Sequence, residues 1–311
     1  MTLTQLRAFL AIADVGTVHG AAEQLFVTQS AVSSAVIALQ RSLGFNLVSR
    51  EGRGVRLTEA GLVYADYIRR ILGLLDEANT VAAAEADPEH GSLRIAATTT
   101  AGEQILPHLL TSFRFRHPQV GIRLEVGNRE RVRALLHRHE VDLLLSGRPA
   151  EQRDQRVLGV RPHELIVVAP DMPTTGNAGA QDLARWLAGQ PWMLREPGSG
   201  TREATETLLT GLTSRFAPRT LTVGSNAAIR ESVIAGLGVT LISRDAVARE
   251  LEEGRLVEVP APGTPLPRDW YLIANPGRLS ATASTFVSHA LAMRELKPPP
   301  TSSAPAPERR G

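Results

Sequence analysis

The spacing of hydrophobic residues changes once along the chain, near Gly91, and this change constrains the fold most strongly. Before Gly91, apolar residues recur every three or four positions, which is the period of amphipathic helices. After Gly91, short apolar runs alternate with helical segments, and this alternation predicts a parallel sheet built from β-α-β units. A length of 311 residues suits two domains. We therefore predict an α + α/β protein, with a helical module followed by an α/β module.

Three short helices, a hairpin and a long helix are predicted before Gly91. Gly16 and Gly44 end the first and third helical patterns, and Thr28 is a suitable N-cap for the third helix. A glycine-rich turn between two short apolar pieces predicts the hairpin, and Pro88 marks the end of the long helix. The predicted helices span residues 3–13, 18–26, 28–43 and 58–86, and the hairpin spans residues 45–57.

The α/β module is predicted as an alternation that continues almost to the end of the chain. The predicted strands are residues 93–97, 120–126, 141–146, 165–169, 192–195, 220–223, 239–242 and 270–274. The predicted helices are residues 105–115, 128–139, 181–187, 201–210, 227–235, 246–252 and 279–296.

The third helix has two faces of different chemistry. One face is an apolar stripe, and the other carries small hydroxylated side chains. A solvated face is the alternative interpretation, but such faces favour Glu, Lys and Arg, which form helices better than serine does. Small side chains instead allow another molecule to approach closely, as DNA does at the second helix of a helix-turn-helix. The stripe is Val32, Ala35, Val36, Leu39 and Leu43, and the opposite face is Ser30, Ser33, Ser34, Ile37 and Arg41.

The net charge of +2 hides an uneven distribution of charged residues. Residues 24–58 contain four arginines and one acidic residue, whereas residues 59–90 contain two arginines and seven acidic residues. A surface that binds phosphates is kept free of carboxylates, because affinity for DNA depends on the release of counterions by basic groups. The charge pattern therefore favours DNA as the partner of the third helix and the hairpin.

Specific residues of this module resemble the winged helix-turn-helix of LysR-type transcriptional regulators. The resemblance covers most of residues 3–90, and the order of the later elements extends it to about residue 296. Ser30 replaces the proline usual in the family, Gln40 the usual glutamate, and Val48-Ser49 the usual phenylalanine, which leaves the base preference open. The resemblance is carried by Ala21-Ala22, Leu25, Thr28-Gln29-Ser30-Ala31-Val32-Ser33, Leu39, Leu43-Gly44, Leu47, Arg50 and Val55-Arg56-Leu57-Thr58-Glu59-Ala60-Gly61.

The resemblance implies that the start of the third helix reads bases in the major groove. Gln29 is the best candidate for an adenine edge, and Thr28 would cap the helix and contact a phosphate. The wing would contribute arginines to the DNA backbone or the minor groove, although an ion pair with Glu59 is an alternative role for Arg56. The residues implied to contact DNA are Thr28, Gln29, Ser30, Ser33, Ser34, Arg50, Arg53 and Arg56.

The long helix carries a heptad-like apolar stripe. We interpret it as a dimeric coiled coil in which one asparagine helps to fix the register, and a dimer would bind an interrupted palindrome. An amphipathic helix packed on its own domain is the alternative. The stripe consists of Ala65, Ile68, Leu72, Leu75, Asn79 and Ala82.

Three strand-to-helix junctions of the α/β module carry small hydroxyl or amide side chains. They are residues 98–100, 198–202 and 224–226. Each could bind an anion at the start of a helix, and ligands of open α/β sheets bind at such carboxyl ends of strands. A plain helix cap is the alternative for any single junction. The three together favour a ligand-binding cleft.

The family resemblance implies a two-subdomain effector domain similar to type II periplasmic binding proteins. A small, unidentified, anionic metabolite would bind between the subdomains, and residues 195–202 resemble the branch containing regulators of carbon-fixation and sulfur-assimilation operons. The chain is thus expected to comprise a DNA-binding domain (1–58), a linker helix (59–90), effector subdomain I (92–161 with 267–296), subdomain II (162–266) and a disordered tail (297–311). The implied effector-binding residues are Thr98, Thr100, Ser199, Thr201 and, more weakly, Asn226.

The composition narrows the alternatives. The chain has no cysteine, which excludes disulfides, thiol nucleophiles and the cofactor-bearing cysteine of the porphyrin-pathway deaminases that share this α/β fold. No histidine has metal-ligand spacing, and so we expect no metal site. We also expect that the protein has no cofactor and is not an enzyme. No signal peptide or membrane span is visible, which predicts a cytoplasmic protein.

The expected partners are operator DNA, the metabolite and further copies of the chain, as a homodimer or homotetramer. The resemblance also allows RNA polymerase as a partner, and no membrane partner is expected. A ligand-independent DNA-binding or architectural protein is the alternative function.

Overall fold

Two compact units make up the protein, and each has its own hydrophobic core. One unit comprises residues 1–79 with 137–140, and the other comprises the rest of the chain. The computed structural model describes residues 1–52, 54–87, 90–147, 149, 155–171, 180–212 and 218–299.

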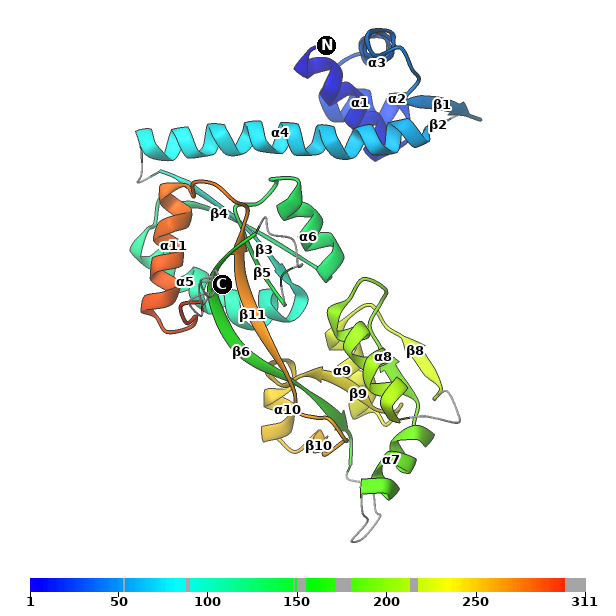
Figure 1. The fold of residues 1–311 in the computed structure, drawn as a ribbon, viewed down its shortest axis with the longest axis vertical. Helices are drawn as coiled ribbons and strands as arrows, with labels where there is room; N and C mark the ends of the chain where they lie inside the picture. The colour runs from blue at the N-terminus through cyan, green and yellow to red at the C-terminus, as the bar shows by residue number, and fades with distance from the viewer. Residues whose placement is uncertain are drawn as a thin grey trace, which may run out of the picture. The chain divides into compact units, whose positions relative to one another are not determined.

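The amino-terminal unit is a helix-turn-helix followed by a two-stranded wing and a long helix (Figure 1). The hydroxyls of Thr2, Thr17 and Thr28 accept backbone N–H bonds at the starts of the first three helices. Gly16 and Gly44 close the first and third helices in the left-handed conformation that glycine adopts without strain. The elements are α1 (Leu3–Val15), α2 (Val18–Leu25), α3 (Gln29–Leu43), β1 (Val48–Glu51), β2 (Gly54–Leu57) and α4 (Glu59–Ala86).

The first half of the apolar stripe predicted for a coiled coil on α4 packs into the core of its own unit. Ala65 and Ile68 are each 1% exposed, and Leu72 packs against the same cluster. For these three positions the coiled-coil interpretation was therefore wrong, and the alternative of a helix packed on its own domain holds. Leu75, Asn79 and Ala82 are not part of this core, and for them the interpretation stays a prediction. A different apolar row of α4 is exposed, consisting of Leu62, Val63, Tyr67, Ile71 and Leu74.

The second unit follows the predicted alternation of strands and helices. No helix in the described part of the chain combines the length and the apolar character needed to cross a membrane. Its strands are β3 (Ser92–Thr98), β4 (Gly121–Gly127), β5 (Leu143–Ser146), β6 (Arg156–Ala169), β7 (Trp192–Leu194), β8 (Thr220–Thr222), β9 (Thr240–Ser243), β10 (Val257–Val259) and β11 (Leu266–Ala274). Its helices are η1 (Ala101–Ile105), α5 (Leu106–Arg116), α6 (Arg129–His137), α7 (Ala180–Gly189), α8 (Gly200–Leu212), α9 (Asn226–Ile234), η2 (Arg244–Ala246), α10 (Ala248–Glu252) and α11 (Ala281–Ala292).

The main sheet is mixed and not purely parallel as predicted. It has the order β10-β6-β11-β5-β3-β4, and β9 also pairs with β6. Strand β3 pairs in parallel with β4 and β5, whereas β11 is antiparallel to both β5 and β6. The alternation of strands and helices correctly indicated the parallel part. It could not indicate β11, which returns antiparallel to β5 and β6.

Strands β6 and β11 are longer than predicted and form one continuous antiparallel ribbon (Figure 1). Pro162 lies opposite Asp269, and Pro267 lies opposite Glu164. Each proline lacks an N–H group and therefore argues against a strand in the sequence. Within a sheet, proline is tolerated at a position where one edge of its strand has no neighbouring strand to bond with. Strand β9 pairs with β6 only from Leu165 onward, which leaves that freedom at Pro162.

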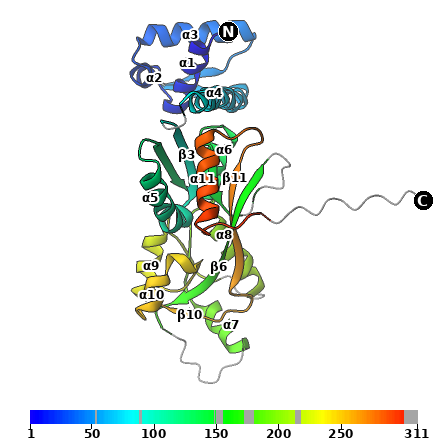
Figure 2. The same ribbon diagram turned by 90° about the vertical axis from the view of Figure 1, so that its left-hand side faces the viewer.

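The ribbon joins two lobes that have separate hydrophobic cores (Figures 1 and 2). In lobe I, α5 and α11 cover one face of β3, β5 and β11, and α6 covers the other face. In lobe II, α7 and α8 pack on one face of β6 and β9, and α9 packs on the other. On β6, Leu158 packs in the core of lobe I and Leu165 in the core of lobe II. On β11, Trp270 packs in the core of lobe I and Leu266 in the core of lobe II.

The end of the described chain is tied to the ribbon. Lys297, with which the predicted tail begins, exchanges two backbone hydrogen bonds with Val160, each 2.8 Å long. Residues 300–311, which make up most of the predicted tail, lie outside the described residues.

The burial of α4 against the helix-turn-helix can be tested with Ile68→Ala. We expect this substitution to lower the free energy of unfolding by about 2–4 kcal/mol, because it opens a cavity in a closed core. Chemical denaturation followed by circular dichroism measures the change. Ile37→Ala is the matched control, because Ile37 is 53% exposed, and it should change stability by less than about 0.5 kcal/mol. Equal losses in the two variants would contradict the assignment of Ile68 to the core.

Candidate functional site

Helix α3 buries one face and exposes the other, as the two predicted faces require. Val32, Val36 and Leu39 are at most 3% exposed. On the opposite side Ser30, Ser34, Ile37 and Arg41 are exposed, and Ser33 is half-buried at the edge of this face. Thr28 caps the helix by accepting a 3.2 Å hydrogen bond from the Ala31 N–H group. The exposed face therefore begins at a capped helix start and carries short hydroxyl side chains.

The side chain of Gln29 is held by a neighbour on α2. Its amide Nε2 lies 3.1 Å from His19 Nδ1, and His19 Nε2 lies 3.4 Å from the Glu23 carboxylate. An amide nitrogen has two N–H groups, so donation to His19 leaves the second N–H and the oxygen free. A free amide edge of this kind can pair with an adenine base. No feature of the sequence indicated this contact.

The wing carries the predicted arginines on an antiparallel hairpin. Arg50 and Arg56 are exposed, and Arg56 Nη1 lies 3.6 Å from Glu51 Oε1. The acidic partner of Arg56 is thus Glu51 on the neighbouring strand and not Glu59. Arg53 lies outside the described residues.

Gln40, which replaces the usual glutamate, supports the entry to the wing. Its Oε1 accepts hydrogen bonds from the N–H groups of Leu47 (2.7 Å) and Val48 (3.0 Å). An amide oxygen accepts these bonds as a carboxylate would, so this departure from the family pattern preserves the local structure.

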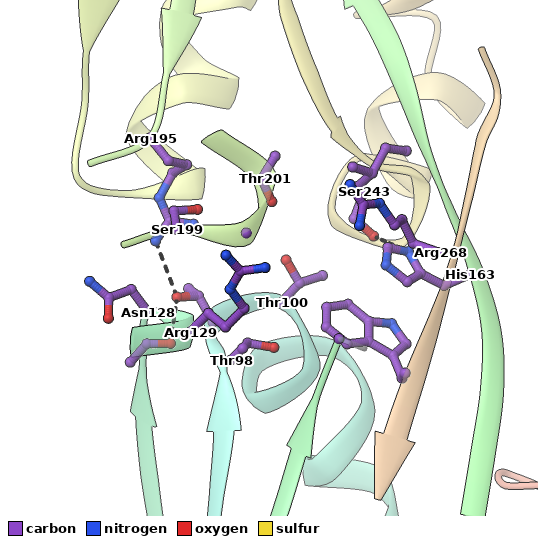
Figure 3. Close-up of a pocket in the computed structure, with 16 residues that line it drawn as sticks. Thr98, Thr100, Asn128, Arg129, His163, Arg195, Ser199, Thr201, Ser243 and Arg268 are labelled. Atoms are coloured by element: carbon purple, nitrogen blue, oxygen red, sulfur yellow. Dashed lines mark hydrogen bonds between the residues drawn. The ribbon is translucent and has the colours of Figure 1, made fainter. Parts of the chain in front are cut away.

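In the second unit, a pocket lies between lobes I and II beside the ribbon (Figure 3). Thr98 and Thr100 reach it from the end of β3, and Ser199 and Thr201 reach it from the start of α8. Four of the five predicted effector-binding residues therefore meet in one pocket. The fifth, Asn226, is buried but is not part of the pocket wall. The other residues lining the pocket are Thr99, Gly127, Asn128, Arg129, Gly147, His163, Leu165, Arg195, Gly200, Ser243, Arg268 and Trp270.

Asn226 instead takes part in a hydrogen-bond network that links the two lobes. Arg195 donates to Asn226 Oδ1 (2.5 Å) and to Thr99 Oγ1 (3.3 Å), and Asn226 Nδ2 donates to Thr100 Oγ1 (3.0 Å). Arg195 and Asn226 are each 6% exposed. Such buried polar groups are costly unless each finds a partner, so this network favours the arrangement that closes it.

Two arginines that line the pocket, Arg195 and Arg129, have acidic partners. Arg195 donates two hydrogen bonds to the carboxylate of Glu196, and Arg129 forms an ion pair with Glu203. Burial alone would raise the pKa of Glu196, but the bonds from Arg195 lower it below its ordinary value. Glu196 is therefore ionised at neutral pH and compensates the charge of Arg195.

The turn before α8 approaches lobe I closely. Gly198 has a φ of +84°, and a Cβ atom at this position would lie 2.6 Å from Glu130 Oε2. The left-handed backbone favours glycine here, whereas the Glu130 carboxylate is the end of a flexible side chain that could move aside. The carbonyl of Gly198 also accepts a 3.3 Å hydrogen bond from the Glu130 N–H group.

The ribbon supplies one wall of the pocket (Figure 3). His163 on β6 stacks on Trp270 of β11, with ring centroids 4.2 Å apart and planes 9° apart. Burial lowers the pKa of His163 to about 4, so this imidazole is neutral at physiological pH. Arg268 lies directly opposite His163 in the ribbon. None of these three residues was predicted for the site. His163 and Arg268 lie in parts of β6 and β11 that the prolines excluded from the predicted strands, and Trp270 begins a predicted strand whose pairing the sequence does not indicate.

Two buried polar atoms of the pocket residues lack partners. Neither Thr98 Oγ1 nor the indole Nε1 of Trp270 forms a hydrogen bond within the described structure. Thr98 Oγ1 is directed into the pocket (Figure 3). Buried polar groups normally find a partner, so Thr98 Oγ1 is an unsatisfied polar atom at the wall of the pocket. The described residues contain no group of three His, Asp or Glu side chains arranged to hold a metal ion.

The burial of His163 can be tested through the dependence of stability on pH. Between pH values of about 6.5 and about 4 the unfolded chain binds a proton at this residue and the folded chain does not. Stability is therefore present above pH 6.5 and lost as the pH falls toward 4, by up to roughly 3 kcal/mol. His163→Phe keeps a ring on Trp270 and removes the titration. Thermal unfolding of the full chain should fall less steeply with acidification in this variant, and identical slopes would contradict the assignment.

Two family models match the chain. The model described as "Bacterial regulatory helix-turn-helix protein, lysR family" matches residues 3–62, and the "LysR substrate binding domain" matches residues 86–294. The RuBisCO operon transcriptional regulator of Allochromatium vinosum is 38% identical over 290 residues, which cover 92% of this chain and 94% of the relative. The HTH-type transcriptional activator CmpR of Synechocystis sp. is 34% identical over 295 residues, covering 94% of this chain and 96% of the relative.

Solved structures agree with the fold. The regulatory domain of Synechocystis CcmR, solved in complex with 2-PG, has a TM-score of 0.59 and 30% identity, covering 65% of this chain and 96% of that domain. CbnR, a LysR family transcriptional regulator, has a TM-score of 0.66 and 21% identity, covering 94% of this chain and 99% of that chain. These relatives are regulators and not enzymes. The predicted resemblance is confirmed: the chain belongs to the LysR family of transcriptional regulators, in the branch that includes RuBisCO operon regulators.

Proposed function

We propose that this LysR-type regulator responds to a small anionic metabolite that binds in the pocket between lobes I and II. The observation that carries the proposal is the convergence of Thr98, Thr100, Ser199 and Thr201 from both lobes on one pocket. The complex of the similar CcmR regulatory domain with 2-PG supports a small-molecule ligand at this domain.

We infer an anionic ligand from the hydrogen-bond donors where α8 begins at the pocket. Helix α8 begins at Gly200, so its first backbone N–H groups and the positive end of its dipole lie beside Ser199 and Thr201. The unpartnered Thr98 hydroxyl can donate to the same ligand. Hydroxyl and N–H donors around a helix start are the usual environment of a bound phosphate or carboxylate.

Ligand binding would change the relation between the lobes. Residues 92–161 with 267–296 form the first proposed subdomain and residues 162–266 the second. Donors from both must turn toward one ligand, so an arrangement that brings them together binds the ligand more tightly. A ligand shifts a conformational equilibrium only through such a difference in affinity, and it can in this way alter how the DNA-binding domains are presented.

The DNA-contacting surface that we propose is the exposed face of α3 together with the wing. Gln29, held by His19, would read a base edge, and Arg50 and Arg56 would contact phosphates. Thr28, Ser30, Ser33, Ser34 and Arg53 complete the proposed set.

The exposed apolar row of α4 is the proposed dimer contact, in place of the first half of the stripe inferred from the sequence. Leu62, Val63, Tyr67, Ile71 and Leu74 are each at least 50% exposed, and they follow one another at helical spacing. A homodimer formed in this way, or a homotetramer built from it, would act on chromosomal DNA in the cytoplasm and could there meet RNA polymerase.

The effector site is tested by Thr201→Val in a thermal-shift titration with 2-PG and with inorganic phosphate. The wild-type protein should be stabilised by at least one of these anions, and the variant should require about tenfold more ligand because a hydrogen-bond donor is lost. Thr207→Val is the matched control, because Thr207 is an exposed threonine on the same helix, and it should behave as wild type. Unchanged binding by Thr201→Val would refute the site. A wild-type protein that no anion stabilises would favour the ligand-independent alternative.

The DNA-binding face is tested by Ser33→Glu. A carboxylate at this position would face the phosphates and bases, so specific binding to the promoter DNA upstream of the neighbouring operon should be lost. Fluorescence anisotropy measures the affinity, and analytical ultracentrifugation checks that assembly is unchanged. Ser42→Glu adds the same charge at the far end of the same helix and should bind nearly as well as wild type. Equal affinity of wild type and Ser33→Glu would refute the assignment.

A further inference from the structure

The contact between His19 and Gln29 joins the two helices of the helix-turn-helix. Gln29 is the first residue of α3, and its amide Nε2 lies 3.1 Å from Nδ1 of His19 on α2. Both side chains are exposed, so this bond is made at the surface and not in the core. An exposed hydrogen bond contributes little to stability. Its effect is instead on the direction in which the Gln29 amide points.

Helix α2 holds His19 in a fixed place beside the start of α3. Ala21 and Ala22 anchor α2, because both are buried in the core of the amino-terminal unit. The turn that follows is closed by a 3.0 Å hydrogen bond from the Val27 N–H group to the Ala22 carbonyl. The Gln29 side chain has more rotatable bonds than the imidazole. Of the two residues, His19 is therefore the one that orients its partner.

The neighbours of the His19 imidazole determine which of its nitrogens carries the proton. A neutral imidazole has one N–H donor and one acceptor nitrogen. His19 Nε2 lies 3.4 Å from a carboxylate oxygen of Glu23, and a carboxylate accepts hydrogen bonds but does not donate them. This contact favours the proton on Nε2 and leaves Nδ1 as the acceptor. Nδ1 then pairs with the nitrogen of the Gln29 amide and not with its oxygen.

The Gln29 amide consequently presents one donor and one acceptor to DNA. His19 uses one of its two N–H groups, which leaves the second N–H and the oxygen. In the major groove adenine offers an N–H donor beside an acceptor nitrogen, and these match the amide. Guanine offers two acceptors there, and the amide oxygen can pair with neither. The orientation that His19 imposes thus favours adenine over guanine.

We propose that His19 is a positioning residue for DNA recognition, which selects adenine by fixing the orientation of the Gln29 amide. His19 acts through Gln29 and does not itself read a base. This inference rests on the proposed role of Gln29 in reading a base edge, and it adds the residue that decides which base is preferred.

The test measures the base preference of full-length variants by fluorescence anisotropy. Each base pair of one half-site in the promoter DNA upstream of the neighbouring operon is replaced in turn by the other three. The position that Gln29 reads is the one at which wild type discriminates and Gln29→Ala does not. At this position wild type should bind operators with adenine at least about fivefold more tightly than operators with guanine.

His19→Ala should narrow this preference by about threefold or more, because the amide is no longer held in one orientation. His19→Asn is the rescue variant. Its side-chain oxygen takes roughly the place of Nδ1 and is an acceptor, so the preference should stay within about twofold of wild type. Gln24→Ala removes an exposed amide of α2 and should also retain the preference. Thermal unfolding within about 3 °C of wild type shows that the variants are folded.

The remaining outcomes separate the two proposals. If Gln29→Ala discriminates as wild type does at every position, Gln29 reads no base, and its proposed role and this inference fail together. If His19→Ala keeps the wild-type preference at the Gln29 position, only the inference about His19 fails. An equal loss of affinity for all operators would make His19 a phosphate contact, which also overturns the inference. A wild-type preference for guanine at that position would contradict the orientation of the amide.

Discussion

The antiparallel pairing of β6 with β11 is the constraint on which the rest of the effector-binding unit depends. Its register runs from Leu266 opposite Leu165 to Ala274 opposite Arg156, so the same ladder crosses from one lobe core to the other. The hydrophobic core of lobe I includes one half of this ribbon, and the core of lobe II includes the other half. The residues that the ribbon contributes to the pocket are therefore held at fixed spacings by this ladder.

The pocket combines a rigid wall with donors that depend on how the lobes meet. His163, Arg268 and Trp270 are fixed by neighbouring rungs of one ladder. The threonines and Ser199 come from separate lobes, and the bonds of Arg195 and Asn226 to Thr99 and Thr100 hold those lobes together. The buried hydrogen bonds of Arg195 and Asn226 therefore favour the arrangement of the two lobes in which they are formed.

Much of the fold follows from the sequence, because helix caps, glycines and hydrophobic period are local signals. Gly16, Thr28 and Gly44 bound their helices as predicted. The direction of β11 is not local, since nothing within the strand records which neighbour it will join. The face of α4 that packs inward was also beyond local analysis. Both of its apolar rows have helical spacing, and only the position of the helix-turn-helix core decides which one is buried.

The site divides in the same way. Thr98, Thr100, Ser199 and Thr201 could be predicted because strand-to-helix junctions bring hydroxyls to helix starts. His163, Arg268 and Trp270 could not, because they come together through strand pairing across about one hundred residues of chain. Asn226 was predicted to bind the effector, but it lies outside the pocket wall and forms hydrogen bonds with Arg195 and Thr100.

The ion pair between Arg56 and Glu51 has a consequence for the ionic-strength dependence of DNA binding. A wing arginine that already has a carboxylate partner attracts fewer condensed ions to exchange, and on meeting a phosphate it must first give up that partner. Glu51 would then remain beside the sugar-phosphate chain as a repulsive charge. In the proposed complex with DNA, the wing would therefore act with a smaller effective charge than its number of arginines. Non-specific attraction to DNA would be reduced, and discrimination among sequences would depend on the hydroxyl and amide groups of α3.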